Sequence, residues 1–200
     1  MRKSLTVTIL GLLLFMTGCI PSLHPLYTDS DLIFDPMLVG EWTSKDGKET
    51  WTFTKDTGKN YKLEYIDKDG KKGGFDVHFL KVKGSRYLDL FPVTPDLKEN
   101  DFYRGHLMPV HSFMRVQQIE PTFQMAMMKP DWIKKFLQKN PTAISHEDVD
   151  GTIVLTAQPK ELQAFLIKHE KTADAWDDCD PMTRRERSVN LSFGSSYENR

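Results

Sequence analysis

Residues 50–66, TWTFTKDTGKNYKLEYI, carry the two-residue alternation that decides the fold class. In the first half two aromatic residues alternate with threonines. In the second half Tyr61, Leu63 and Tyr65 alternate with charged side chains. Successive side chains of a strand point to opposite faces, so this pattern predicts two half-buried strands.

The same alternation extends outward from this stretch. Phe75, Val77 and Phe79 continue it, and the dipeptides Asp46-Gly47 and Asp69-Gly70 are typical of tight hairpin turns. Further strand candidates are residues 40–43, 86–91, 102–108, 110–119, 122–128 and 152–156. Roughly eight to ten short strands joined by turns predict an antiparallel barrel or sandwich.

Two helices are expected near the C-terminal end of this mainly β domain. Asp131 is a candidate cap for the first, whose apolar face would carry Trp132, Ile133, Phe136 and Leu137. The second begins near Pro159 and groups Leu162, Phe165 and Leu166. Each helix needs an apolar surface to cover.

The N-terminus has the pattern of a secretory signal. Arg2 and Lys3 precede an apolar run of roughly 12 residues, whereas about 20 are needed to span a bilayer. The run ends in Met16-Thr17-Gly18-Cys19, which resembles the lipobox of bacterial lipoproteins. The resemblance implies that residues 1–18 are a signal peptide and that Cys19 becomes the acylated N-terminus.

An acylated Cys19 implies attachment to a membrane of the bacterial cell envelope. Two or three acyl chains hold a protein stably, whereas one is marginal. The next residue is Ile20 rather than aspartate, which by enteric-type sorting implies the outer membrane, facing the periplasm. The alternatives are an ordinary signal peptide with an incidental cysteine and an uncleaved hydrophobic anchor.

The rest of the chain divides into three parts. Residues 19–31 contain Pro21 and Pro25 and predict an extended tether, in which His24 and Tyr27 are expected to pack against their own domain. Residues 32–171 form the β domain. Residues 172–200 are polar and mixed in charge and predict a disordered tail.

Gly40-Glu41-Trp42, preceded by a turn at residues 36–39 and followed by a strand meander, resembles the lipocalin family of the calycin barrels. The resemblance implies an eight-stranded barrel in which Gly40 and Trp42 close one end and an apolar cavity opens at the other. In that family an arginine on the last strand packs over the tryptophan. The last strand expected here, residues 152–156, contains no arginine.

Candidate cavity residues follow from the alternation, because aromatic and methionine side chains suit an adaptable apolar pocket. The inner face is expected to carry Tyr61, Tyr65, Phe79, Met114, Phe123, Met125 and Met127. A one-residue change of register would turn a whole strand's set outward. The same residues would equally suit a filled core.

Composition and motifs exclude several classes of function. Net charge is −1, and −3 without residues 1–18, with the charges mixed along the chain, so no nucleic-acid partner is expected. No nucleophile elbow, zinc-protease or phosphate-loop motif is present, and acidic neighbours disfavour a Cys179 thiolate. We therefore expect no enzyme and no cofactor.

The histidines of the chain do not predict a metal site. His78, His106 and His111 match no standard ligand spacing. Two hypotheses remain: a membrane-anchored barrel that binds a small apolar molecule or lipid, or an envelope interaction or accessory subunit whose barrel is filled. The sequence names no protein partner for the second.

Overall fold

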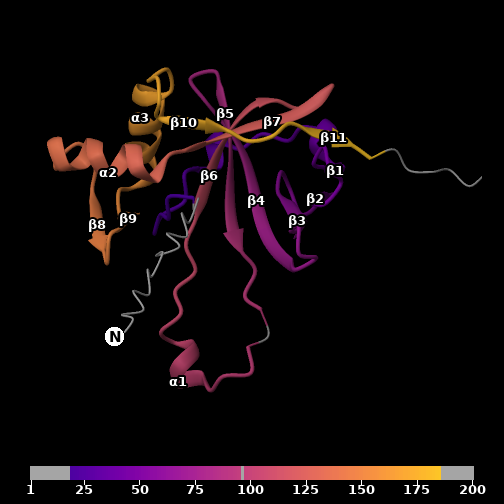
Figure 1. Ribbon diagram of the computed structural model, residues 1–200, viewed down its shortest axis with the longest axis horizontal. Coiled ribbons are helices and arrows are strands. Elements are labelled where there is room, and N and C mark those ends of the chain that lie inside the picture. Colours follow the sequence, from indigo (N-terminus) through magenta and orange to yellow (C-terminus); the bar gives the residue numbers. More distant parts are fainter. Residues whose placement is uncertain (1–18, 96, 186–200) are drawn as a thin grey trace, which may run out of the picture.

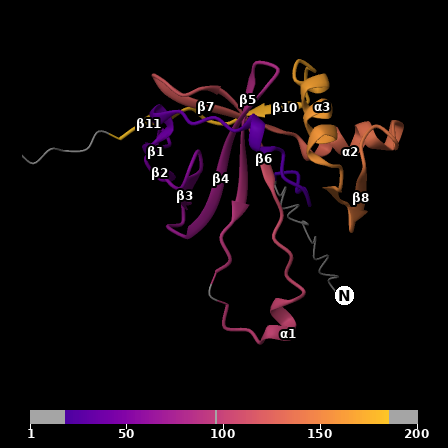
Figure 2. The same ribbon diagram turned by 180° about the vertical axis from the view of Figure 1, so that it is seen from behind.

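The structure, a computed structural model, describes residues 19–95 and 97–185 (Figures 1 and 2). The predicted signal peptide, residues 1–18, lies outside the described residues. The strands are β1 (Gly40–Thr43), β2 (Thr50–Lys55), β3 (Tyr61–Ile66), β4 (Lys72–Val82), β5 (Ser85–Pro92), β6 (Ser112–Gln118), β7 (Thr122–Met128), β8 (His146–Val149), β9 (Thr152–Leu155), β10 (Trp176–Asp178) and β11 (Met182–Arg184). The helices are α1 (Asp101–Arg104), α2 (Pro130–Lys139) and α3 (Pro159–His169), with 3-10 turns η1 (Asp29–Asp31) and η2 (Pro36–Leu38).

The sheet closes into an antiparallel barrel of eight strands. β1 to β7 pair with their neighbours in chain order, and β11 pairs with both β7 and β1 to complete the ring. β10 extends the same ladder along the far half of β7. The predicted mainly β antiparallel barrel is therefore confirmed, and the DG dipeptides form turns in which Gly47 and Gly70 have φ of 71° and 77°.

The quoted alternation sets the register of the barrel. Phe53 lies opposite Leu63, and Tyr61 lies opposite Val77, so their side chains share one face. That face is the barrel interior, where these residues belong to one buried cluster with Trp42.

The C-terminal boundary was predicted wrongly. Residues 176–178 and 182–184, placed in a disordered tail, are strands of the barrel sheet, whereas β9, expected as the last barrel strand, pairs only with β8 in a separate hairpin. Without a neighbour, the edges of β1 and β7 would present unpaired backbone N–H and C=O groups. The short strand β11 supplies their hydrogen-bond partners. Residues 186–200 lie outside the described residues.

A second local correction concerns residues 102–108, which were expected to form a strand. The segment begins with the single turn of α1, where the Asn100 side chain accepts a hydrogen bond from the Tyr103 amide at 3.0 Å. The side-chain cap outweighs the short apolar run.

Arg184, the last residue of β11, packs over Trp42 with its guanidinium carbon 4.3 Å from the ring centroid. It donates to the carbonyls of Val39 and Met37 and pairs with Glu120 at 2.9 Å. Trp42 is fully buried. The arginine expected over the tryptophan is thus present, on a strand that sequence reasoning missed.

The packing of Arg184 over Trp42 also requires a glycine at position 40. Its φ is 139°, in the region that favours glycine, and a Cβ there would collide with the Arg184 guanidinium. Trp42 Nε1 donates to the Leu38 carbonyl at 2.9 Å, so η2 covers this end of the barrel. The turn begins at Asp35, whose side chain accepts a hydrogen bond from the Met37 amide at 2.9 Å.

A second layer covers one side of the barrel (Figure 1). α2, α3 and β9 pack with the N-terminal segment against outward residues of the barrel such as Leu80 and Tyr87, forming a separate buried cluster. Both helices were predicted. α2, however, starts at Pro130 after Lys129, so Asp131 lies inside the first turn and is not its cap.

Residues 19–32, which we call the strap, are not an extended tether. Ile20 and Leu26 are buried in the second cluster, and Ser22 exchanges backbone hydrogen bonds with His111 at 2.9 and 2.8 Å. Apolar side chains at these positions make packing more favourable than solvation. The strap is part of the domain.

Replacing Arg184 by alanine is expected to lower the free energy of unfolding by about 2 kcal/mol, because the cation–π contact and several hydrogen bonds are lost together. Urea denaturation measures this. The matched control is Arg185→Ala, whose more exposed side chain pairs with Glu41 and whose loss should cost less than about 0.5 kcal/mol. Equal effects of the two changes would contradict the closing role of Arg184.

Candidate functional site

The barrel interior holds five of the seven predicted cavity residues as packed core. Tyr61, Phe79, Met114, Phe123 and Met125 have exposed fractions between 0 and 6% and share one cluster. Phe123 contacts Trp42 and Phe53 with ring centroids 5.3 and 5.9 Å apart. These five side chains therefore lie on the inner face of the barrel and pack in one buried cluster.

Tyr61 also closes the covered end. Its hydroxyl accepts from the Asp35 amide at 2.7 Å and donates to the Asp35 carbonyl at 3.1 Å, while its ring stacks on Phe34. Burial raises the pKa of Tyr61 to about 12. The side chain is thus a structural bridge between β3 and the turn before β1.

The opposite end, which we call the mouth, is less tightly covered. Tyr65 and Met127, the other two predicted cavity residues, are half-buried there, and Tyr65 packs on Trp51 with centroids 5.3 Å apart. A separate shallow depression of about 380 Å³, open to solvent, lies on the outer face of β2, β3 and β4 between Thr52, Glu64 and Val93. None of the seven candidates lines it.

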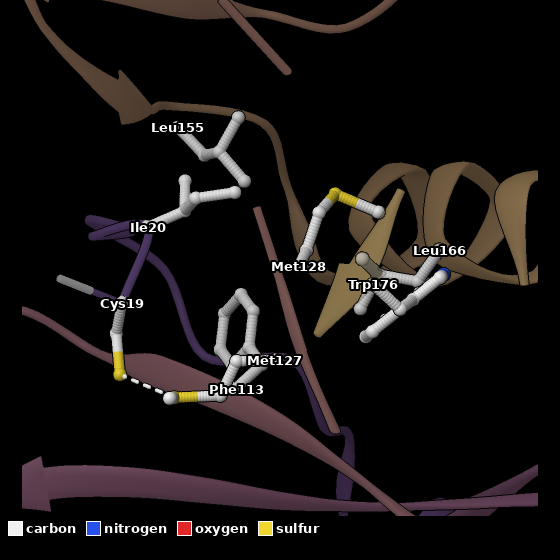
Figure 3. A pocket seen from close by; sticks show the side chains of 8 residues that line it. All are labelled: Cys19, Ile20, Phe113, Met127, Met128, Leu155, Leu166 and Trp176. Atoms are coloured by element: carbon white, nitrogen blue, oxygen red, sulfur yellow. Dashed lines mark hydrogen bonds between the residues drawn. The ribbon is translucent and has the colours of Figure 1, made fainter. Parts of the chain in front are cut away.

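Cys19 lies at the mouth, with its thiol turned toward the protein (Figure 3). Its Sγ donates to Met127 Sδ at 3.2 Å, and burial raises the pKa of the thiol despite a hydrogen bond to Ser112. An apolar crevice of about 20 Å³ adjoins it, between Ile20, Met128 and Trp176. That volume holds about one water molecule.

Cys179 packs against the same end of the barrel core. It follows β10, its amide donates to the Met125 carbonyl at 2.8 Å, and both cysteines are free thiols. Burial, followed by the neighbouring Cys19 and acidic residues, raises its pKa to about 11. Neither thiol is activated as a nucleophile.

A buried carboxylate fastens the strap to the barrel. Asp89, on the outer face of β5, is fully buried and accepts from the Leu26 amide at 2.6 Å and from His111 Nδ1 at 2.7 Å. A buried acid is stable only when hydrogen-bonded in this way. Asp89 therefore joins the strap, the barrel and the residue before β6.

His78 lies beside this group on β4. Tyr27 stacks on its ring with centroids 4.0 Å apart, and burial lowers the pKa of His78. His24 Nε2 lies 3.0 Å from the Gln158 side-chain nitrogen. Both strap residues therefore contact their own domain.

Residues 93–95 and 97–111 belong to an arm between β5 and β6 that extends away from the barrel (Figures 1 and 2). Its tip bears four apolar side chains with large exposed fractions: Phe102 81%, Met108 73%, Tyr103 53% and Leu107 48%. The turn of α1 and an ion pair between Arg104 and Asp101 at 2.7 Å organise the tip. Four large apolar side chains exposed within seven residues indicate a contact site.

The three histidines considered for a metal lie in different environments. His111 Nδ1 is bonded to Asp89, His106 Nδ1 lies 2.7 Å from the Phe102 carbonyl, and His78 stacks on Tyr27. Within residues 19–95 and 97–185 no three His, Cys, Asp or Glu side chains are grouped to hold a metal ion. Over the same ranges, no helix has the length and apolar character to cross a bilayer.

Comparison with known proteins adds no relative. The chain matches no protein-family model, no curated protein and no solved structure.

Sequence reasoning missed the arm and the strap carboxylate. Phe102 and Met108 were assigned to a strand, although Asn100 at a cap position and Gly105 shortly after it indicate a single helical turn. Asp89 interrupts the apolar run YLDLFP at an outward position. A charge between two apolar neighbours was the available signal that something covers that face.

The stability of the strap region is expected to depend on pH through His78. Because its pKa in the folded protein is lowered, the unfolded chain binds the proton more strongly, and stability present above the unfolded pKa of about 6.5 is lost as pH falls through the folded value. Urea denaturation at a series of pH values from neutral downward measures the slope.

The control for this prediction is His78→Gln, which removes the titrating ring. The variant should lose less stability on acidification than the parent. Some pH dependence remains, because burial also lowers the pKa of His169. An unchanged slope in His78→Gln would contradict the prediction.

Proposed function

We propose that this protein is a lipid-anchored, non-enzymatic component of the bacterial cell envelope, whose barrel is a packed scaffold and whose outer surfaces make its contacts. The observation that carries this proposal is the filled interior. Five residues expected to line a cavity are instead buried against one another and against Trp42. Packed interiors hold few voids, whereas ligand pockets need about 300 Å³ or more.

The lipobox-like ending and the place of Cys19 support the anchor. In the structure Cys19 Sγ contacts Met127, so a diacylglyceryl group on that sulfur requires the residue to turn outward. The strap is packed from Ile20 onward. A lipid on Cys19 would therefore hold the domain directly against the bilayer, without a spacer, and we place it at the outer membrane facing the periplasm.

The barrel is compatible with a calycin-like fold, and we propose that it is a lipocalin-like variant that has lost its cavity. Gly40, Trp42 and Arg184 form the closed end that the family resemblance implied, with Arg184 supplied by β11. The opposite end is reduced to a mouth at Tyr65 and Met127. These two side chains are the accessible remainder of the predicted ligand site.

Non-enzymatic action is supported by the chemistry of the described residues. The sulfur of Cys19 would be occupied by the lipid, and burial raises the pKa of Cys179 to about 11, so that its thiol stays protonated and weakly nucleophilic. The buried pair of Asp89 and His111 is occupied in holding the strap. This pair therefore attaches the strap to the barrel.

Intact-mass analysis of protein extracted from membranes tests the anchor. We expect the mature chain to begin at Cys19 and to carry the added mass of a diacylglyceryl group and an amide-linked acyl chain. Cys19→Ser should abolish the added mass, while Cys179→Ser should leave it unchanged. A mature chain without lipid, or one that retains residues 1–18, would contradict the proposal.

Fluorescent fatty-acid titration tests the filled barrel against the carrier hypothesis. The chain from residue 19 onward, which contains every described strand and helix, should show no saturable binding, because the interior offers no space. A fatty-acid carrier of known stoichiometry, titrated with the same probe, serves as the positive control. Saturable binding at one probe per parent protein would favour the ligand carrier.

A further inference from the structure

The exposed tip of the arm is the part of the described surface whose chemistry is least explained by the fold. Phe102 and Met108, exposed by 81% and 73%, make few contacts, and the Phe102 ring meets only His106 among aromatic partners, at 4.8 Å. Soluble surfaces rarely gather such side chains without a binding role. We propose that the tip of the arm inserts into the interfacial region of a lipid bilayer and forms a second membrane contact beside the lipid anchor.

The position of the arm supports this occupant. The arm joins the end of β5 to the start of β6, and Ser22 bonds to His111 at the arm's base. Cys19 bonds to Met127 Sδ near the end of β7 and lines the same crevice as Phe113, the second residue of β6. Cys19 and the arm therefore leave the barrel at the same end.

Chain length places the tip within reach of a bilayer that holds Cys19. Ser22 is three residues along the chain from Cys19, which limits the distance between Cys19 and the arm's base to about 10 Å. Seven residues link α1 to β6, so the tip lies no more than about 30 Å from the barrel. A bilayer that holds Cys19 would therefore lie at the end of the barrel from which the arm extends. The proposal rests on the proposed anchor only for this orientation.

The chemistry of the tip also fits the bilayer interface. Aromatic, leucine and methionine side chains are combined with Arg104, whose charge is paired with Asp101 at 2.7 Å. Paired charges reduce the cost of approaching the headgroups, and amphipathic rings such as Tyr103 suit that depth. The arm's residues sum to a charge of −1, so attraction to anionic lipid cannot drive binding. Apolar burial is the driving force.

A single helical turn on two extended legs is a poor template for a protein partner. α1 has four residues, too few to present a helical face to a groove. Specific protein interfaces bury about 800 Å² on each partner with close shape complementarity. Insertion into lipid needs no such complementarity.

Co-sedimentation with vesicles tests the arm separately from the anchor. The protein is the chain from residue 19 with Cys19→Ser, which carries no lipid, mixed with vesicles of phosphatidylethanolamine and phosphatidylglycerol. Binding is expected to change little with added salt or with omission of phosphatidylglycerol. The double substitution Phe102→Glu and Met108→Glu should lower the partition coefficient about tenfold or more.

The matched control replaces two exposed apolar residues outside the arm, Met37→Glu and Val149→Glu, exposed by 49% and 54%. It should bind within about twofold of the parent, and all variants should keep the parent's circular dichroism spectrum and thermal midpoint. A second readout is Tyr103→Trp, whose added fluorescence should be quenched by brominated lipid chains.

The outcomes separate clearly. Loss of binding in the tip variant alone, with quenching at position 103, supports insertion. A parent that does not bind vesicles, or a tip variant that binds equally well, overturns it. Capture of one envelope protein by a crosslinker at position 103 without vesicle binding would assign the arm to a protein partner and also overturn the proposal. A failed lipid assignment at Cys19 would leave these results unaffected.

Discussion

Closure of the barrel by β11 is the constraint on which the rest of the structure depends. Without it β1 and β7 would each present an unpaired edge, a condition that favours aggregation. The three residues of β11 pair with both strands, and Arg184 adds a contact over Trp42 and hydrogen bonds to the turn before β1. Gly40 is glycine because that guanidinium occupies the space of a side chain.

The wall formed by β4, β5 and β6 separates two buried clusters. Inward residues such as Leu88 belong to the barrel core, and outward neighbours such as Tyr87 belong to the layer of strap and helices. Asp89, also outward, fastens the strap across this wall. This arrangement explains why the strap is ordered structure: its apolar residues complete the second core.

The sequence predicted the fold to the extent that local patterns determine it. Alternation gave the strands from Trp51 to Met127, glycine turns gave the hairpins, and apolar periodicity gave α2 and α3. It could not give β10 and β11, because three-residue strands with single apolar residues, Trp176 and Met182, are defined by their partners rather than by their own pattern.

Only part of the candidate site could be predicted, for a related reason. Alternation identified which face of each strand points inward, so Tyr61, Phe79 and Phe123 were placed correctly. Whether an inner face encloses space depends on the summed volume of side chains from all strands, which no single segment records. The arm and the strap likewise depend on contacts between segments far apart in the chain, such as Ser22 with His111.

The pairing of β1 with β11 also governs when the barrel can form. Trp42 lies opposite Arg184, so its partner becomes available only after more than a hundred further residues have been synthesised. Until then the hairpins from β2 to β7 can assemble, but the ring stays open. Such a long-range contact slows folding and leaves a partly assembled sheet exposed. During that interval the open sheet is the state of the chain most exposed to aggregation.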